Sequence, residues 1–560
     1  MSDPVPTSPP LPPVTARSLA VGLVLSLVLC AMNSYLTLSF GVIEEGPTIA
    51  ALFFFAFFFL SKTKITTTEM VIVATMGSAG GSLGFISNFY AAKAMTGTPY
   101  SVMDMVLFGI VSSLVGLVMV IPLRQILILK EKLPWPGAKA VETVIRALIE
   151  HGDPRQPIIL LAVFLSGAAY VVLNGDGLGV VPTETALPGL AAVGGAIAWS
   201  PFAIGGSYLM GMRTCVGFLV GAVTLMIVAP YTPTPESPNA YYWPGLGFLV
   251  ASGLMVMAVN WRTIAGAFRS ILALGGRTDD DDPVLSGRVL GVFALLSFVL
   301  TVAVLGWRFA VPIAMSVVLI LVAGLIQNII ATRAAAQTNF NPARVMGILL
   351  QGVTSAMGGS KVDINLTGAG FVAGSGAQAS LLTNDLVYGQ AFRVPSRWQF
   401  WTQTITVIPC TVISAYVFLL ILHGDKPLSL TELPDHPGHP APVAKMWAKS
   451  AQIFEGGMSA LPPGALKWLL VGGAIGMVYT LLEYIPRLRR WIPDAIGVGL
   501  GLVLAPSLGI SFFLGGFLLW IVLGEWLEWS PTTLTTIAVG SIVAEGIGGV
   551  LQAGVVWLVG

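Results

Sequence analysis

Apolar segments close to the length of a membrane-crossing helix recur along almost the whole of this chain. An α-helix needs about 20 predominantly apolar residues to cross the hydrocarbon core of a bilayer. Backbone groups in that core have no water to bond, and these apolar runs are continuous rather than alternating, so they fit helices and not barrel strands. Apolar residues make up 55% of the chain and charged residues only 10%, which excludes an ordinary soluble globular protein. We therefore expect an all-α polytopic membrane protein.

Repeated strings suggest an internal duplication. VGGAI occurs at Val193–Ile197 and again at Val471–Ile475, and a Pro-x-Ala-Ile-Gly string follows each copy, from Pro201 and from Pro493. Counting apolar segments gives about eight in each half, with Leu187–Met210 as one span of the first half. An even number of spans lets both halves run in the same direction. We expect about 16 transmembrane segments in two repeated eight-span halves.

A second, weaker pair of similar strings occurs in the same order in the two halves. VASGL at Val250–Leu254 resembles VAEGI at Val543–Ile547, which makes Ser252 the repeat partner of Glu545. Only the second half has a carboxylate at this position. This asymmetry suggests that one half has a binding role at this position and that the other half has only a packing role.

Basic residues divide the connecting loops into two sets. The polar segment between the halves carries Arg262, Arg269, Arg277 and Arg288, whereas the loops 174–185 and 231–243 have no lysine or arginine. Under the positive-inside rule, the N-terminus and this segment are cytoplasmic in a multi-pass protein of the cell inner (plasma) membrane. The expected organisation is a disordered N-terminal tail (1–16), a first membrane repeat (17–261), a cytoplasmic linker (262–288) and a second membrane repeat (289–560) that includes an external Pro-rich loop (423–463).

Four segments are too short, or too rich in glycine and proline, to be simple helices. Unwound backbone is tolerated at membrane depth only where protein or water satisfies it, and such breaks mark the binding sites of many transporters. We expect broken or re-entrant helices that build the site at Met76–Asn88, Pro201–Met212, Met357–Gly376 and Pro493–Gly509.

One polar segment resembles a known family. The string ASLLTNDLVYG, which ends at Gly389, resembles the Asp-Leu/Phe-Lys-Thr-Gly motif of the oligopeptide transporter family, within it the yellow stripe-like and bacterial branches. Asp385, Gly389 and Pro395 match that motif and the Pro-Arg after it, whereas Val387 stands where the family usually has lysine. The departure removes a cation that would anchor an anionic substrate. Further stretches that resemble the family, in its order, are Leu36–Leu38 with Gly46-Pro47, Thr67–Thr75, Leu133–Ala138 and Ala544–Gly546.

The resemblance implies a proton-coupled secondary transporter that imports small peptides or metal-chelate, siderophore-like complexes by alternating access. Its partners would be that small-molecule substrate, protons and the lipid bilayer. A passive channel or facilitator for a small polar solute is the alternative, and rings of like charge would be expected for it. The chain has no HExxH, P-loop or CxxC motif, so we expect no enzyme and no cofactor. No basic tract suggests nucleic acid, and a homodimer stays open.

A proton-coupled carrier needs a carboxyl group that loads and releases a proton within the membrane. The proton-coupling candidates are Asp385, Glu545, Glu69, Glu45 and Glu44. Glu44 and Glu45 would equally serve as an external helix cap, and Glu69, after a threonine-rich loop, as a helix N-terminal cap.

Polar side chains in or beside apolar segments are the substrate-binding candidates. Lys361 and Asp363 lie beside a glycine-rich turn, where they either neutralise each other or leave Lys361 to bind an anionic substrate. His436 and His439 form an HxxH pair without a third ligand, so no metal site is predicted. The full set of binding candidates is Asn33, Asn88, Asn328, Lys361, Asp363, Gln378 and Asn384.

Overall fold

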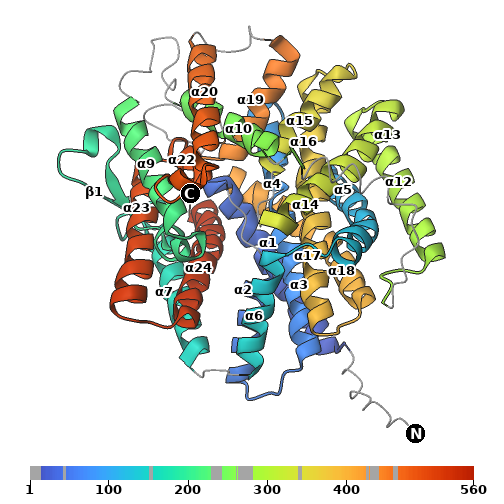
Figure 1. Cartoon of the computed structure of the whole chain (residues 1–560), viewed down its shortest axis with the longest axis horizontal. Helices are drawn as coiled ribbons and strands as arrows, with labels where there is room; N and C mark the ends of the chain where they lie inside the picture. Colours follow the sequence, from blue (N-terminus) through green and yellow to red (C-terminus); the bar gives the residue numbers. More distant parts are fainter. Residues whose placement is uncertain are drawn as a thin grey trace.

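The structure is a computed structural model, and it is helical apart from one small hairpin in the part of the chain that it describes (Figure 1). It describes residues 14–41, 46–150, 155–228, 242–259, 261–262, 282–338, 343–423, 428, 440–457 and 464–559. The predicted tail, most of the linker and Glu44 and Glu45 lie outside the described residues.

The first half of the chain contains α1 (Ala16–Phe40), α2 (Gly46–Leu60), α3 (Thr67–Gly84), α4 (Ser87–Thr96), α5 (Val102–Leu123), η1 (Arg124–Lys130), α6 (Pro136–Glu150), α7 (Arg155–Leu173), β1 (Glu184–Ala186), η2 (Ala191–Val193), β2 (Ala196–Ala198), η3 (Phe202–Gly206), α8 (Ser207–Met210), α9 (Met212–Val228) and α10 (Tyr242–Val259).

The second half contains α12 (Gly287–Phe309), α13 (Ile313–Leu321), η6 (Val322–Gln327), α14 (Asn328–Thr338), α15 (Ala343–Ala356), α16 (Val362–Phe371), η7 (Val372–Gly376), α17 (Ala377–Ala391), α18 (Ser396–Leu422), α19 (Pro442–Gly456), α20 (Ala465–Glu483), α21 (Pro486–Arg489), α22 (Ala495–Gly501), α23 (Pro506–Gly516), η9 (Phe517–Trp526) and α24 (Pro531–Val559). Segments η1, η3, η6, η7 and η9 are π-helical, and η2 is a 3₁₀ turn.

Local signals account for the ends of the first long helix. The Thr15 side chain accepts a hydrogen bond from the Ser18 N–H, which satisfies a free donor at the start of α1. Gly41 ends the helix in the left-handed conformation, with φ of 68°.

Ten helical stretches among the described residues are long and apolar enough to cross a membrane, and four shorter apolar helices accompany them. The protein is therefore a multi-pass membrane protein, as its apolar segments predict.

The predicted span Leu187–Met210 is wrong. Its first part belongs to an antiparallel hairpin in which Thr185 of β1 pairs with Ile197 of β2, and apart from the short 3₁₀ turn η2 helical structure begins near Phe202. Gly189 and Gly194 both have φ of 78°, a conformation that interrupts a helix and closes turns. The apolar composition of this segment therefore does not make a helix.

The described helices form two groups (Figure 1). The small bundle consists of α7 to α10 and α20 to α24. The large bundle consists of α1 to α6 and α12 to α19. The two bundles meet where α1 packs on α24 and α2 on α7, and the rings of Phe53 and Phe164 lie edge to face there at 5.7 Å.

The four segments predicted to be broken are interrupted in the structure. One α-helix ends and the next begins between α3 and α4 and between α22 and α23, and the segment from Pro201 starts with the π-helical η3. In the fourth segment a turn precedes α16, and the π-helical η7 then joins α16 to α17. The glycine and proline content of these segments explains the breaks, since neither residue favours a continuous α-helix.

The VGGAI match proves misleading. Val193–Ile197 lies in the turn before β2 and in β2 itself, whereas Val471–Ile475 lies inside α20. The two copies therefore occupy unrelated environments.

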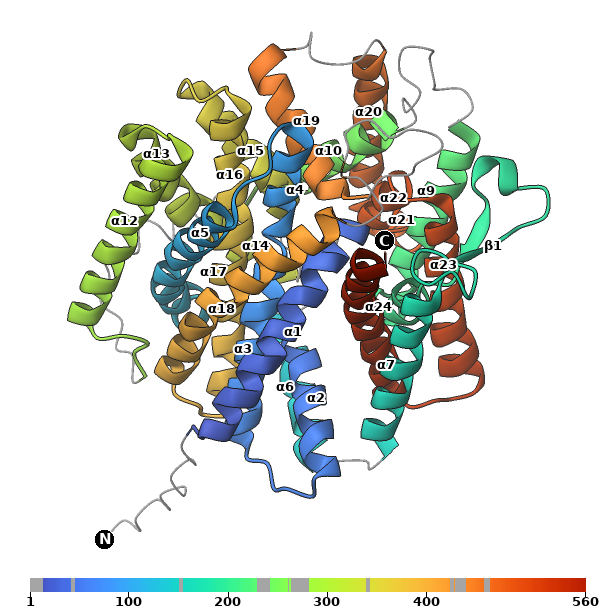
Figure 2. The same ribbon diagram turned by 180° about the vertical axis from the view of Figure 1, so that it is seen from behind.

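Helix directions also differ from the predicted parallel halves. Gln156 bonds to Thr533 and Gln552 to Asn174, so α7 and α24 run in the same direction. Gly247 lies against Leu469, and Ser252 bonds to Gly476, so α10 and α20 also run together. Figures 1 and 2 show that α7 begins at the lower end of the molecule and α20 at the upper end. Helix α10 therefore runs opposite to its sequence partner α24, and the prediction of one common direction is wrong for this pair.

The predicted external loop contains a helix that sequence analysis missed. Helix α19 starts at Pro442, a residue well suited to a first helical turn, and its Trp447 is fully buried. Helix α19 packs on α4, α15 and α16, and the Ala441 N–H donates a 2.7 Å hydrogen bond to the Leu38 carbonyl. This part of the loop is thus built into the large bundle.

Candidate functional site

Helices α3, α17 and α18 of the large bundle present polar side chains to one another at two levels. On α17, Gln378 and Asp385 are seven residues apart, which is about two helical turns and therefore one face. On α18, Gln399 and Gln403 are four residues apart and share a face in the same way. All four residues are buried, and we call the two levels together the polar ladder.

The first level joins all three helices. The Gln403 amide donates to the Gln378 Oε1 at 2.5 Å, and the Gln378 amide donates to the Ser82 hydroxyl at 2.9 Å. The Oε1 of Gln403 has no hydrogen-bond partner among the described residues. An acceptor is therefore left open at the end of a buried chain of amides.

The second level surrounds the backbone of Asp385. The Gln399 amide donates to the Asp385 carbonyl and to the Thr75 hydroxyl, both at 2.9 Å. The hydroxyls of Thr75 and Tyr388 lie 3.3 Å apart. Asp385 itself is fully buried on α17, in the segment that carries the family-like motif.

Two π-helical segments lie beside the ladder. Asn328, just after η6, donates to the Ser375 hydroxyl of η7 at 2.7 Å. Both amide atoms of the neighbouring Gln327 are buried without a hydrogen-bond partner among the described residues. Single π-helical turns within α-helices occur frequently at functional sites. The hydrogen bond between Asn328 and Ser375 therefore extends the polar region from α17 toward α14.

Glu545 lies apart from the ladder, on α24 of the small bundle. Its Oε2 accepts a 2.9 Å hydrogen bond from the Ser200 hydroxyl and a 3.4 Å bond from the Phe202 N–H at the start of η3. The next residue, Gly546, allows close contact with α1, because a Cβ there would lie 2.1 Å from the Met32 Cγ. Glu545 is thus buried near the interface of the two bundles.

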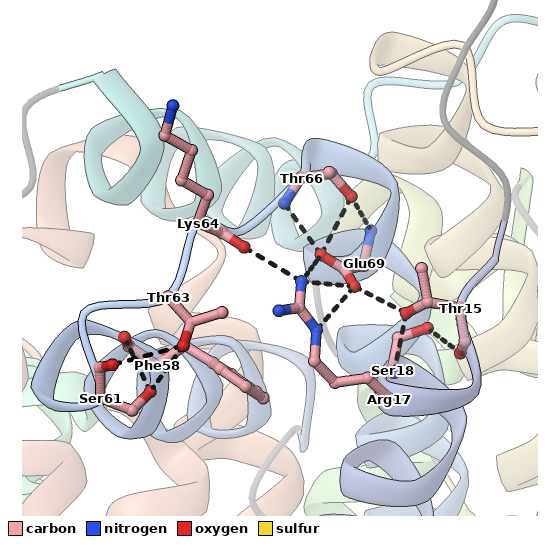
Figure 3. Close-up of polar contacts among 9 residues, drawn as sticks. All are labelled: Thr15, Arg17, Ser18, Phe58, Ser61, Thr63, Lys64, Thr66 and Glu69. Atoms are coloured by element: carbon pink, nitrogen blue, oxygen red, sulfur yellow. Dashed lines mark hydrogen bonds and ion pairs between the residues drawn. The ribbon is translucent and has the colours of Figure 1, made fainter.

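Glu69 forms the densest set of polar contacts (Figure 3). It makes a capping box with Thr66 at the start of α3, which confirms the capping interpretation. The same carboxylate lies 2.6 Å from the Arg17 guanidinium and accepts a 2.6 Å hydrogen bond from the Thr15 hydroxyl. These contacts tie the beginning of α1 to the beginning of α3, away from the ladder.

Lys361 and Asp363 do not form the predicted pair. Asp363, in the first turn of α16, pairs with Lys93 at the end of α4, and its side chain is 63% exposed. Lys361 is the exposed residue that precedes α16. Both lie at helix ends, so neither reaches the buried polar ladder.

The remaining binding candidates are buried. The Asn88 amide donates to the Thr37 hydroxyl at 2.7 Å and so joins α4 to α1. Asn33 lies on α1, and Asn384 lies on α17 beside Asp385. Only Gln378 belongs to the ladder, and Asn328 adjoins it through η7.

Sequence analysis missed five residues of this region. Gln399, Gln403 and Gln327 were not among the predicted binding residues, and neither were Thr75 and Ser82. A signal was present: Gln399, Thr402, Gln403 and Thr406 recur at helical spacing around the start of an apolar segment. Thr75 and Ser82 on α3 show the same seven-residue spacing as Gln378 and Asp385.

The described residues hold no group of three or more His, Cys, Asp and Glu side chains placed to bind a metal ion. His436 and His439 lie outside the described residues.

The family described as OPT oligopeptide transporter protein matches residues 13–556. The chain is also similar to a putative oligopeptide transporter of Saccharomyces cerevisiae, with 24% identity over 251 residues, which is 42% of this chain. That match covers 33% of the yeast protein, so the chain spans about a third of its relative's length. The family match covers nearly the whole sequence, and the chain therefore belongs to the oligopeptide transporter family.

Proposed function

We propose that this protein is a proton-coupled secondary transporter that imports small peptides or metal-chelate, siderophore-like complexes by alternating access. The observation that carries the proposal is the polar ladder, a two-level set of buried amides and hydroxyls next to the buried Asp385. Polar groups at membrane depth are costly, so a connected set of them supports a functional rather than a packing role.

Asp385 is the first candidate for the coupling residue. A carboxyl group in a water-poor interior carries a bare charge only at high cost, whereas binding a proton removes that charge. Asp385 lies one level from Gln378 on the same face of α17. A proton bound at Asp385 therefore changes the charge close to the amides that would hold substrate.

The amides suit the proposed substrates. A carboxamide offers two N–H donors and one carbonyl acceptor, which match a peptide bond and also the carboxylate oxygens of a chelate. The open acceptor of Gln403 and the open amide of Gln327 supply such groups without a fixed charge. Since Val387 replaces the motif's lysine, recognition by neutral groups fits this chain.

An inverted pairing of helices, in place of the parallel pairing expected from VGGAI, supports the proposal of alternating access. Gly540 of α24 packs on Leu160 of α7 as Gly247 of α10 packs on Leu469 of α20. Gly247 lies five residues before Ser252, and Gly540 lies five residues before Glu545, so the two glycines occupy matching positions. Inverted repeats let a transporter exchange two mirrored states. In this proposal the bundles rock against each other where α1 meets α24, near Glu545.

The orientation and the membrane belong to the same proposal. The distribution of basic residues supports a cytoplasmic N-terminus in the plasma membrane. The match of Asp385, Gly389 and Pro395 supports the yellow stripe-like or bacterial branch of the family.

The test is uptake into proteoliposomes that contain the purified full-length chain. With an imposed pH gradient, a labelled tripeptide or a ferric siderophore complex should accumulate above its outside concentration, and a protonophore should abolish the accumulation. Asp385→Asn should lose accumulation but keep exchange of substrate across the membrane, whereas Glu528→Gln, an exposed control, should behave as the parent. Equilibration that never exceeds the outside concentration would instead identify a passive facilitator.

A further inference from the structure

A cavity of about 550 Å³ lies between α10, α15, α19 and α20, and its lining includes no residue of the polar ladder. This volume is within the range of about 300 to 1,000 Å³ that holds small ligands. Its lining is apolar except for Lys449 and Ser450 of α19. Ser450 already bonds to Gln351 and to the Trp447 carbonyl. Lys449 is therefore the one charged group available to an occupant in this lining.

The cationic end of the cavity is built around Trp243. The Lys449 ammonium lies 4.2 Å from the centre of the Trp243 ring, which attracts a cation through its π-electrons. Trp243 itself is buried in the first turn of α10. Helix α19 is not one of the candidate membrane spans, and burial lowers the pKa of Lys449 to about 8, so it is still mostly protonated at neutral pH. A tryptophan beside a lysine is typical of the headgroup level of a membrane.

From this end the apolar lining continues along α10. The lining residues of α10 run from Leu246 to Leu254, which corresponds to about 12 Å of helix. Half of a hydrocarbon core measures about 15 Å. The apolar lining of the cavity therefore extends over most of the depth of one leaflet.

One flank of the cavity opens sideways. Leu254 of α10 and Leu470 and Met477 of α20 line the cavity, and their side chains are 42%, 59% and 42% exposed. In a membrane protein such apolar, exposed side chains face lipid chains. The cavity is therefore connected to the bilayer along its flank.

We propose that this cavity binds an anionic phospholipid, with the phosphate at Lys449 beside Trp243 and one acyl chain between α10 and α20. Charge complementarity selects the headgroup, and the apolar lining accepts the chain. A peptide fits this lining poorly, because its backbone amides would be buried without partners. The site joins α10 and α20 of the small bundle to α15 and α19 of the large bundle, so the lipid would bridge the two bundles. This proposal does not depend on which solute the protein transports.

The experiment measures lipid binding to the delipidated full-length chain in detergent by native mass spectrometry. Phosphatidylglycerol and phosphatidylcholine with the same acyl chains are titrated separately. We expect phosphatidylglycerol to bind about tenfold more tightly at one site, the effect of one charge-assisted bond. Lys449→Met, which keeps the aliphatic stem, should remove this preference and weaken phosphatidylcholine less than phosphatidylglycerol, because the choline cation already neutralises the phosphate of phosphatidylcholine. Val250→Phe, which fills the cavity, should reduce the binding of both lipids.

Two matched controls distinguish the site from the rest of the surface. Lys467 also lies over a tryptophan, 5.6 Å from the Trp468 ring, but does not line the cavity, so Lys467→Met should leave the preference intact. Val471→Phe, on the exposed face of α20, should leave both affinities unchanged. A preference that survives Lys449→Met, or that is lost equally in Lys467→Met, would overturn the proposal. Displacement of the lipid by a tripeptide would assign the cavity to the solute instead.

Discussion

The Nε2 of Gln403 on α18 donates a 2.5 Å hydrogen bond to the Oε1 of Gln378 on α17, and both side chains are fully buried. Because the Gln378 amide in turn donates to Ser82, the orientation of one amide determines the orientation of the next. This link makes the first level of the polar ladder a single unit.

Gln378→Leu should remove that unit. The Gln403 amide would lose its acceptor, at a cost of about 1 to 3 kcal/mol for a buried group left unsatisfied, whereas the Ser82 hydroxyl would still donate to the Ala79 carbonyl. We expect a lower melting temperature and at least tenfold slower uptake in proteoliposomes. Gln390→Leu, at an exposed position of the same helix, should change neither quantity. Uptake at the parental rate by Gln378→Leu would show that the polar ladder has only a structural role.

Glu545→Gln should keep the fold, because the amide oxygen can accept the same bonds from Ser200 and from the Phe202 N–H. If Glu545 exchanges a proton during transport, the variant should shift or flatten the pH dependence of uptake. Ser200→Ala, which removes one donor but keeps the carboxyl group, is the control, and its profile should still depend on pH. A parental profile in Glu545→Gln would make Glu545 a structural residue at the start of η3.

Arg17→Met should destabilise the contact between α1 and α3. It leaves the buried Glu69 carboxylate without its ion pair, while Thr15 and Thr66 still donate to it. Since the Arg17 side chain is 33% exposed and partly screened by solvent, we expect a loss of about 1 to 3 kcal/mol in unfolding free energy. A double-mutant cycle with Glu69→Gln checks this, because part of the loss should be recovered in the double variant. Strictly additive losses would mean that the two side chains do not interact.

Lys445→Met should change how stability depends on pH. Burial, and then the nearby Lys449, lower the pKa of Lys445 to about 7 from the ordinary lysine value of 10.5. Between these two values the unfolded chain binds the proton more strongly than the folded chain, so the parent should become more stable as pH rises from about 7 to 10. The variant should lose the part of this increase that Lys445 contributes, keep the part that Lys449 contributes above about pH 8, and melt at a higher temperature at pH 7. Lys467→Met, at another lysine of the same region, should keep the parental slope in thermal unfolding.

Local sequence patterns were sufficient for several features of this protein. Continuous apolar runs require helices in a bilayer, because only internal hydrogen bonds satisfy the backbone there. The cluster Met357–Ser360 identified a break, because glycine disfavours a helix, whereas Met76–Ser82 lies within α3. The Asp385 motif pointed to the family, and the threonine-rich loop before Glu69 pointed to a helix cap.

Other features were decided by contacts between residues far apart in the chain. Ser82 and Gln378 meet across 296 residues, and Ser200 and Glu545 across 345, so no local pattern could pair them. VGGAI misled because the same five residues form a turn and strand in one context and a transmembrane helix in another. The sequence by itself therefore determined that the chain enters the membrane as interrupted helices of this family. Only the tertiary structure decided which faces meet, in which direction α10 and α24 run, and that α19 packs inside the bundle, because these depend on packing and hydrogen bonds that form once distant segments come together.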